Sequence, residues 1–238
     1  GNGSTNNITG VGFQPDFTWL KSRSAVYEHA LFDAVRGTGK LLASNNSDAE
    51  YSGSNLLTAF GTDGFSLGDH APLNNNRTTY ASWNWLGANG TAANTDGSIS
   101  STVSANTTSG FSIVSYTGTG SNATVGHGLG SAPSMIIIKN RSVSSGFWRV
   151  YHSGLNSNNK NLKLNATNAE ATDSSIWNDT SPTNVNFSVG TSSDTNGSGN
   201  AMIAYCFADV QGFSKMGSYI GGGNNFPFIY TGFKPGFV

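Results

Sequence analysis

Apolar residues alternate with other residues along several short stretches of the chain. In YASWNW, residues 80–85, the side chains of Ala81, Trp83 and Trp85 occupy every second position. A period of two is typical of a β-strand that packs on one face, whereas an amphipathic helix repeats every three to four residues. No stretch of the sequence sustains the helical period. Short strands separated by turns rich in Gly, Asn and Ser predict an all-β fold of the sandwich or jelly-roll type.

One stretch is apolar at every position rather than at every second one. Residues 135–138 read Met-Ile-Ile-Ile, and such a run predicts a central strand that is covered on both faces. The segments HALFD, WRVYH and FSIVSY add further predicted strands. The chain therefore has enough strands for more than one sheet.

The sequence repeats itself. GFQPDFTWLKSRS, which begins at Gly12, returns as GSAPSMIIIKNRS from Gly130, and a third version, GFKPGFV, occupies residues 232–238. The alternating aromatic positions repeat as well, because Tyr205 and Phe207 lie in the second copy where the first has Trp83 and Trp85. A fixed pattern that recurs at this length indicates tandem domains.

The repeat predicts the domain organisation. Residues 1–115 form a first β-sandwich repeat with an inserted arm or hairpin at about 86–109, residues 116–218 form the second repeat, and residues 219–238 begin a third. Both ends of the sequence fall inside the repeated pattern, so we expect a portion of a longer tandem array. The joint between the copies contains no Pro-rich or Ser-rich linker, which predicts limited hinge freedom and a stiff rod.

Composition narrows the classes of partner. Charged residues make up 11% of the chain and the formal net charge is −1, compared with about 25% charged residues in an average soluble protein. Binding to nucleic acid depends on neutralising phosphates with basic residues, so we expect no nucleic-acid partner. No apolar run approaches the roughly 20 residues of a membrane span, so we expect no membrane insertion. The single cysteine, Cys206, excludes an internal disulfide.

Groups that carry chemistry are scarce, and we expect no enzymatic activity. The chain has no Gly-x-Ser-x-Gly motif, and its four histidines are dispersed without a metal-binding pair. No predicted strand carries two carboxylates at alternate positions, as a sandwich-type glycosidase would need. The glutamates are Glu28, Glu50 and Glu170. We expect neither catalytic residues nor a cofactor, and we assign these groups structural roles.

Two long loops are the candidates for ligand binding. GDHAPLNNNRT from Gly68 and GTSSDTNGSGN from Gly190 follow equivalent strands but differ in sequence, as recognition loops on a common scaffold do. Spacer loops that have drifted would look the same. The candidate ligand-binding residues are Asp69, His70, Asn75, Arg77, Asp194 and Asn196. Carboxylates such as Asp69 or Asp194 beside backbone carbonyls leave a Ca²⁺ site open as an alternative. The alternating aromatic residues are assigned to the core rather than to a sugar-binding platform.

Several motifs together resemble a known group of proteins. HALFDAVRG, GFSLG, YTGTGSNATVGHGLGSAPSMIIIKNRS and YTGFKPGFV are similar to the tandem β-domain repeats of tail-fibre-like and other structural proteins of marine bacteriophages. The similarity covers essentially the whole chain. It implies a concanavalin-type, lectin-like sandwich on the virion exterior, in an extracellular location, and it supplies no catalytic or binding residues.

The functional hypothesis follows from these observations. We expect a non-enzymatic segment of a phage tail fibre or virion appendage that spaces a receptor-binding tip or contributes to attachment to host-surface glycans. Its partners would be other virion proteins, further repeats of the same chain and copies of itself, for example in a trimer. The alternatives are a carbohydrate-binding module, or a bacterial surface adhesin or filament subunit.

Overall fold

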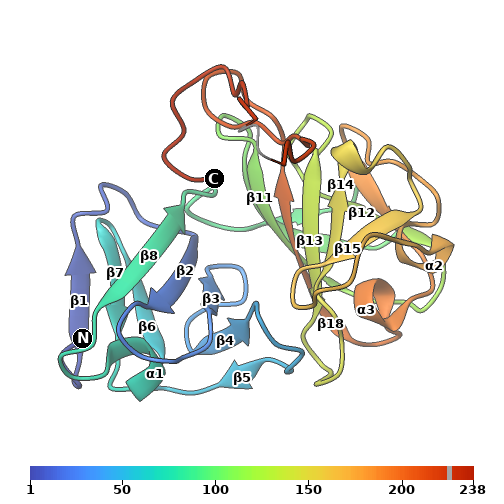
Figure 1. Ribbon diagram of the computed structural model, residues 1–238. Helices are drawn as coiled ribbons and strands as arrows, with labels where there is room; N and C mark the ends of the chain where they lie inside the picture. Colours follow the sequence, from blue (N-terminus) through green and yellow to red (C-terminus); the bar gives the residue numbers. More distant parts are fainter. Residues whose placement is uncertain (224–226) are drawn as a thin grey trace.

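The computed structural model describes residues 1–223 and 227–238 and shows a chain built almost entirely of antiparallel β-sheets (Figure 1). The strands of the first repeat are β1 (Asn6–Thr9), β2 (Phe17–Ser22), β3 (Ala30–Asp33), β4 (Lys40–Ala43), β5 (Tyr51–Ser52), β6 (Leu57–Gly61), β7 (Gly64–Leu67) and β8 (Tyr80–Trp85). They form a five-stranded sheet in the order β5-β4-β3-β2-β8 and a three-stranded sheet in the order β1-β7-β6.

The second repeat has a larger sheet. Its strands are β9 (Ala92–Asn94), β10 (Ser101–Asn106), β11 (Phe111–Thr117), β12 (Ala123–Gly126), β13 (Met135–Asn140), β14 (Arg149–His152), β15 (Lys160–Lys163), β16 (Ala171–Thr172), β17 (Asn186–Val189) and β18 (Ala201–Phe207). The order β16-β15-β14-β13-β18-β11-β10-β9 makes eight strands, and β12 pairs with β17. The short helices are α1 (Ala71–Asn74), α2 (Ser174–Trp177), α3 (Ser193–Asn196) and the 3₁₀ turn Ser153–Leu155.

The two repeats share one topology. β2 lies between β3 and β8, and β13 lies in the same way between β14 and β18. The pairs β1-β7 and β12-β17 cover one face of the large sheet of their own repeat. The prediction of an all-β sandwich fold is therefore confirmed, and the sequence repeat corresponds to a repeat of structure.

The large sheets of the two repeats also pack against each other. One apolar core lies between the five-stranded and three-stranded sheets, and a second lies between the eight-stranded sheet, the β12-β17 pair and α2. A third core joins the repeats, because it combines Phe17 and Leu31 from the five-stranded sheet with Ile113, Ile203 and Tyr205 from the eight-stranded sheet. The repeats thus stack face to face through a shared core rather than following one another as separate beads.

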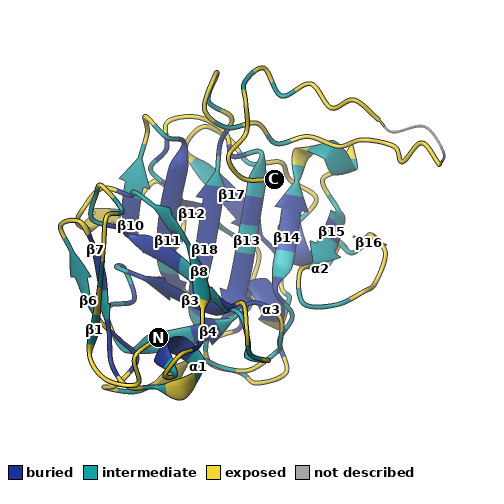
Figure 2. Ribbon diagram, turned by 60° about the vertical axis from the view of Figure 1, so that its left-hand side comes forward, coloured by how far each residue is buried: buried dark blue, intermediate teal, exposed yellow. Residues whose placement is uncertain are grey.

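Strand β13 shows why residues 135–138 are apolar at every position. Ile136 and Ile138 have no exposed surface and belong to the core of the second repeat, whereas Ile137 packs on the core between the repeats. The expected central strand with two covered faces is confirmed. In Figure 2, β13, β18 and β11 form the buried centre of the eight-stranded sheet.

The insert and the boundary between the repeats differ in part from the sequence-based outline. β9 and β10 of the inserted segment form the expected hairpin, but the hairpin does not protrude, because it extends the eight-stranded sheet through β11. β11 itself pairs along its whole length with β18, so the expected repeat boundary after residue 115 falls inside a strand of the second repeat's sheet. A strand belongs to the sheet with which its backbone forms hydrogen bonds. The position of a repeat in the sequence does not reveal which sheet that is.

The C-terminal segment runs over the top of the stacked sheets and is mostly exposed (Figure 2). The predicted start of a third repeat, residues 219–238, includes residues 224–226, which lie outside the described residues. The described part of 219–238 contains no strand.

Candidate functional site

Aromatic rings form the centre of the joint between the repeats. The Tyr205 ring of β18 lies with its centroid 4.5 Å from that of Phe17 on β2, and it stacks on Trp148 at 6.5 Å with an interplanar angle of 17°. Trp148 is fully buried, and its indole Nε1 donates a hydrogen bond of 2.9 Å to the backbone oxygen of Ala43 in the first repeat. Large rings that are buried and hydrogen-bonded in this way fix the orientation of the two sheets as well as their contact.

A buried ion pair lies beside these rings. The Asp33 carboxylate accepts hydrogen bonds from the Arg36 Nε at 2.5 Å and from the Tyr205 hydroxyl at 2.7 Å. The side chains of Asp33 and Arg36 have no exposed surface. Arg36 also donates through Nη2 to the backbone oxygen of Leu31, at 3.0 Å. Because Asp33 and Arg36 come from the first repeat and Tyr205 from the second, the pair is completed only when the repeats are joined.

A second arginine extends this cluster. Arg36 Nη1 donates a hydrogen bond to the Glu50 carboxylate at 3.1 Å. Arg141 of the second repeat donates two more to the same carboxylate, from Nε at 2.8 Å and from Nη2 at 2.9 Å. The Glu50 backbone N–H also donates to the Arg141 oxygen at 2.9 Å. Such a two-point contact is directional as well as strong. We call Asp33, Arg36, Glu50, Arg141 and Tyr205 the joint cluster.

The electrostatics of the joint cluster match its geometry. Burial alone would lower the pKa of Arg36, but the charge of Asp33 raises it above the ordinary value. Burial alone would raise the pKa of Glu50, but the hydrogen bonds from Arg141 and the charge of Arg36 lower it. Burial raises the pKa of Tyr205 well above its usual value. At neutral pH the Arg36 guanidinium and the Glu50 carboxylate are therefore charged, and the Tyr205 hydroxyl keeps its proton to donate.

Lys139 makes one further contact across the joint. Its side chain is fully buried on β13, and its Nζ donates hydrogen bonds to the backbone oxygens of Ser47 at 2.9 Å and Gly146 at 2.8 Å. Burial lowers the pKa of Lys139 to about 8. A lysine with a lowered pKa can act as a nucleophile in an open cleft. Here the nitrogen is enclosed by two carbonyl oxygens, so it serves to hold a loop of the first repeat against the second.

A cavity of about 670 Å³ lies beside the joint, under the C-terminal segment. Trp83 and Trp85 line it, together with Phe207. The ring of Phe237 lies edge-on to both tryptophans, at 6.0 and 5.9 Å between centroids. The aromatic surfaces of this cavity are thus covered by the chain's own C-terminal segment.

The loop of the first repeat exposes two of its four predicted ligand-binding residues. Asp69 is exposed and accepts a hydrogen bond of 2.8 Å from Asn55. Arg77 is exposed and has a left-handed backbone, with φ of 62°. Asn75 is half-buried and reaches the hydroxyl of Tyr27 at 3.3 Å.

His70 lies in the same loop, directly before α1. It is half-buried, and burial lowers the pKa of its imidazole. Its ring centroid lies 6.2 Å from that of Tyr51. Within the described residues its buried Nδ1 has no hydrogen-bond partner.

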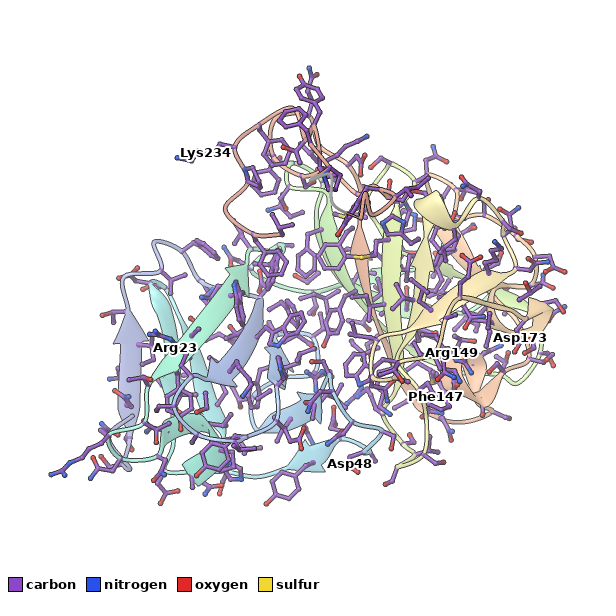
Figure 3. All side chains as sticks on the ribbon, in the orientation of Figure 1. Arg23, Asp48, Phe147, Arg149, Asp173 and Lys234 are labelled. Carbon is purple, nitrogen blue, oxygen red and sulfur yellow. The ribbon has the colours of Figure 1, made fainter. Side chains whose placement is uncertain are left out.

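The predicted residues of the second loop have structural contacts instead. Asp194 is an ion-pair partner of Arg149, at 2.7 Å, and it also accepts from the backbone N–H of Phe147 at 3.2 Å. Arg149 and Phe147 project from the same side of the second repeat (Figure 3), with the guanidinium 5.3 Å from the ring centroid. Asn196 is completely buried. The structure therefore does not bring the six predicted residues together at one surface.

Asn196 shows what the two loops have in common. Its Nδ2 donates to the backbone oxygens of Gly190 at 2.8 Å and Ser121 at 2.6 Å, and its Oδ1 accepts from the N–H of Thr119 at 2.7 Å. Asn74, at the same position in the first repeat, donates to the oxygen of Gly68 at 2.9 Å and is also fully buried. In both repeats the side chain of this asparagine hydrogen-bonds the loop to the segment just before β1 or β12. In the sequence, Asn74 and Asn196 occupy the same position of the two loops, which indicates a common structural role. Asn196 was interpreted as a ligand-binding candidate instead, and Asn74 was not singled out.

The joint cluster was not identified from the sequence as a functional group. Asp33 and Arg36 lie within HALFDAVRG, but their partner Tyr205 is 172 residues from Asp33 along the chain. In the described residues, no group of three or more His, Cys, Asp or Glu side chains is arranged to hold a metal ion. The carboxylates of the joint cluster accept hydrogen bonds from arginine and tyrosine side chains of both repeats. The joint cluster therefore serves to hold the two repeats together.

Comparison with known proteins gives one match. Each helix in the described part of the chain has three or four residues, so none could span a membrane. No curated protein and no solved structure matches the chain significantly. The sequence model of one family, described as "Domain of unknown function (DUF7483)", matches residues 1–238, and the chain therefore belongs to the DUF7483 family.

Proposed function

We propose that this chain is a non-enzymatic structural segment of a phage tail fibre, or of another appendage on the virion exterior. In this role it would set the spacing and orientation of a host-binding tip, or contribute to attachment to glycans of the host surface. Two things support the proposal. The sequence resembles repeats of phage structural proteins, and the two repeats are joined by a buried polar cluster.

The joint cluster is the observation that carries the proposal. An interface between domains that were free to move would be small and largely hydrated. Here Asp33 and Arg36 are fully buried and depend on Tyr205 across the joint. If the repeats separated, a carboxylate and a guanidinium would lose their shared hydroxyl and the surrounding aromatic core. A joint of this kind resists bending, as a spacer in an appendage requires.

Labelling of assembled particles tests this function. Antibodies raised against the purified chain should decorate the tail or the surface appendages of phage that encode it, as seen by immunogold electron microscopy. An antibody against the major capsid protein gives the control pattern. If intact particles carry no label while the chain is present in infected cells, the proposal is wrong. Release of reducing ends from host polysaccharide by the purified chain would contradict its non-enzymatic part.

A carbohydrate-binding role for the first loop is the second candidate. The observation that favours it is the exposure of Asp69 and Arg77 on one loop, while Asp194 and Asn196 in the equivalent loop are buried. Carboxylate and guanidinium groups at a surface can hydrogen-bond sugar hydroxyls. The candidate therefore predicts a site in the first repeat alone.

A glycan array distinguishes the two candidates. Wild-type chain should bind a defined set of glycans, and Asp69→Ala and Arg77→Ala should each weaken that binding. The matched control is Arg23→Ala, because Arg23 is another exposed arginine of the first repeat (Figure 3). Binding that is equally weakened by Arg23→Ala, or no binding at all, would remove this candidate and leave the spacer role in place.

A further inference from the structure

The dipeptide Asn-Gly occurs three times in the chain, at Asn2, Asn89 and Asn196. Glycine has no side chain that would shield its backbone nitrogen, so this nitrogen can approach the side-chain amide of the asparagine before it. The three sites can therefore undergo the same reaction, and their surroundings in the fold decide which of them does.

Asn89 lies at the surface, in the connection between β8 and β9. Residues 88–90 are exposed, and the backbone of Asn89 is left-handed, with φ of 52°. Among the described residues, neither the side-chain amide of Asn89 nor the backbone N–H of Gly90 makes a hydrogen bond. No described atom lies within 4 Å of a Cβ built at Gly90. The two groups that would react are therefore free to meet.

Asn196 has the opposite surroundings. Its side chain is completely buried, and its amide makes the three hydrogen bonds with Gly190, Ser121 and Thr119 described above. A Cβ built at Gly197 would meet a side-chain nitrogen at 2.7 Å. The amide of Asn196 can turn toward the Gly197 nitrogen only after these three hydrogen bonds open.

Asn2 lies between these two cases. It is exposed, but its Nδ2 donates a hydrogen bond of 3.1 Å to the backbone oxygen of Thr5, and its Oδ1 accepts one of 2.9 Å from the N–H of Ser4. Its amide is thus held in place at the surface, whereas the amide of Asn89 is not.

The backbone of Asn89 contacts a buried carboxyl group. The N–H of Asn89 donates to Asp16 Oδ2 at 2.9 Å, and the N–H of Gly87 donates to the same oxygen at 2.8 Å. Asp16 has no exposed surface and directly precedes β2. These two hydrogen bonds hold the connection between β8 and β9 against the first repeat, so a chemical change at residue 89 occurs beside a buried acid.

We propose that Asn89 is a site of spontaneous deamidation, at which asparagine is converted to a mixture of isoaspartate and aspartate. The Gly90 nitrogen loses its proton to hydroxide and attacks Cγ of Asn89. A C–N bond forms, and the amide nitrogen leaves as ammonia after taking a proton from water. Water then opens the resulting cyclic imide. Opening at the main-chain carbonyl carbon gives isoaspartate, and opening at the side-chain carbonyl carbon gives aspartate.

Either product changes the connection between the repeats. Both place a carboxylate on the residue whose N–H binds Asp16. Isoaspartate also adds one carbon to the backbone, which lengthens the path from β8 to β9. The modification goes beyond the proposed structural role and does not depend on it.

Mass spectrometry of the full chain tests the site. The folded protein is kept in mildly alkaline buffer, well below its Tm, and samples taken over time are digested with chymotrypsin. Conversion appears as the mass gain of an amide that becomes an acid, and fragment ions assign it to one residue. Methylation by an isoaspartyl methyltransferase identifies the isoaspartate. Asn89 should convert at least about tenfold faster than Asn196, because three buried hydrogen bonds have to open at Asn196 first.

Two controls separate the effect of the fold from that of the dipeptide. In urea, Asn89 and Asn196 should convert at similar rates, because both are followed by glycine. Gly90→Ala should fold normally, since the position has room for a Cβ and its φ is not left-handed. This variant should convert several-fold more slowly, because the added methyl group hinders closure of the ring.

Four results would overturn the proposal. Asn89 could remain an amide in the folded chain while it converts in urea, or Asn196 could convert as fast as Asn89 in the folded chain. The two rates could differ in urea as much as they do in the folded chain, in which case the fold does not select the site. Finally, Gly90→Ala could convert as fast as wild type.

Discussion

Replacing Arg36 with methionine tests how the joint is held together. Methionine has a similar length and no charge, so the change removes the guanidinium and leaves the space largely filled. Asp33 would keep the hydroxyl of Tyr205 and the backbone N–H of residue 36 at 2.8 Å. It would lose the charge that balances its own. Glu50 would retain its two bonds from Arg141.

Arg36→Met should lower the free energy of unfolding by a large amount, because the Asp33 carboxylate that remains is buried. Neither Asp33 nor Arg36 has exposed side-chain surface, and removal of one partner of a buried pair costs about 3–5 kcal/mol. That is a substantial part of the roughly 5–15 kcal/mol by which domains are stable. For a chain of this size each kcal/mol lowers Tm by about 2–4 °C.

A double variant isolates the cause of this loss. In Asp33→Asn/Arg36→Met, the amide oxygen can still accept from the backbone N–H of residue 36, and the amide nitrogen can donate to the Tyr205 oxygen. Because no uncompensated charge remains, the double variant should regain at least about 1.5 kcal/mol relative to Arg36→Met alone.

Urea unfolding followed by tryptophan fluorescence gives both free energies of unfolding, and Trp148 is a suitable probe because it stacks on Tyr205. The reasoning is refuted if Arg36→Met unfolds within about 1 kcal/mol of wild type, or if the double variant is no more stable than the single one.

Three further outcomes follow from the same structure. Trp148→Ala should lower the free energy of unfolding by about 3–5 kcal/mol, measured by urea unfolding followed by circular dichroism, because it empties the centre of the shared core. Asn196→Ala should cost about 1–3 kcal/mol by leaving buried backbone groups without partners, whereas Asn75→Ala should change Tm little; equal effects would contradict this assignment. The lowered pKa of Glu50 contributes stability above its unfolded value of about 4.5 that is lost as pH falls through the folded pKa. Glu50→Gln should therefore be less stable than wild type at pH 7, and the difference in free energy of unfolding between the two should disappear in acid. A difference that stays constant with pH would contradict this role of the Glu50 charge.

The strands could be predicted from the sequence because side-chain alternation records burial. The apolar run at residues 135–138 implied two covered faces, and Ile136 and Ile137 do face different cores. The pairing of β2 with β3 and of β13 with β14 follows from short connections between neighbouring strands. Self-comparison of the two copies then revealed that these units recur.

What lies opposite a buried face could not be predicted. The pattern around Trp83 and Trp85 showed that one face of β8 is apolar, but both the core of the same repeat and the neighbouring repeat would satisfy it. The same limit applies to Asp33, whose partner Tyr205 is distant in sequence. Asn196 was a candidate for ligand binding because its loop is polar, yet its amide is used by backbone groups. Polar residues in loops do not show in the sequence whether they face solvent or the chain itself.

The joint has a consequence for synthesis of the chain. Asp33 precedes Tyr205 by 172 residues, and at about 5–20 residues per second a ribosome needs roughly 9–34 s to make that interval. Until it has passed, the face of the five-stranded sheet that carries Phe17 and Leu31 lacks the cover that Ile203 and Tyr205 of β18 supply. Translation speed and chaperones that shield aromatic surface should therefore determine the yield of folded chain, even where the finished protein is stable.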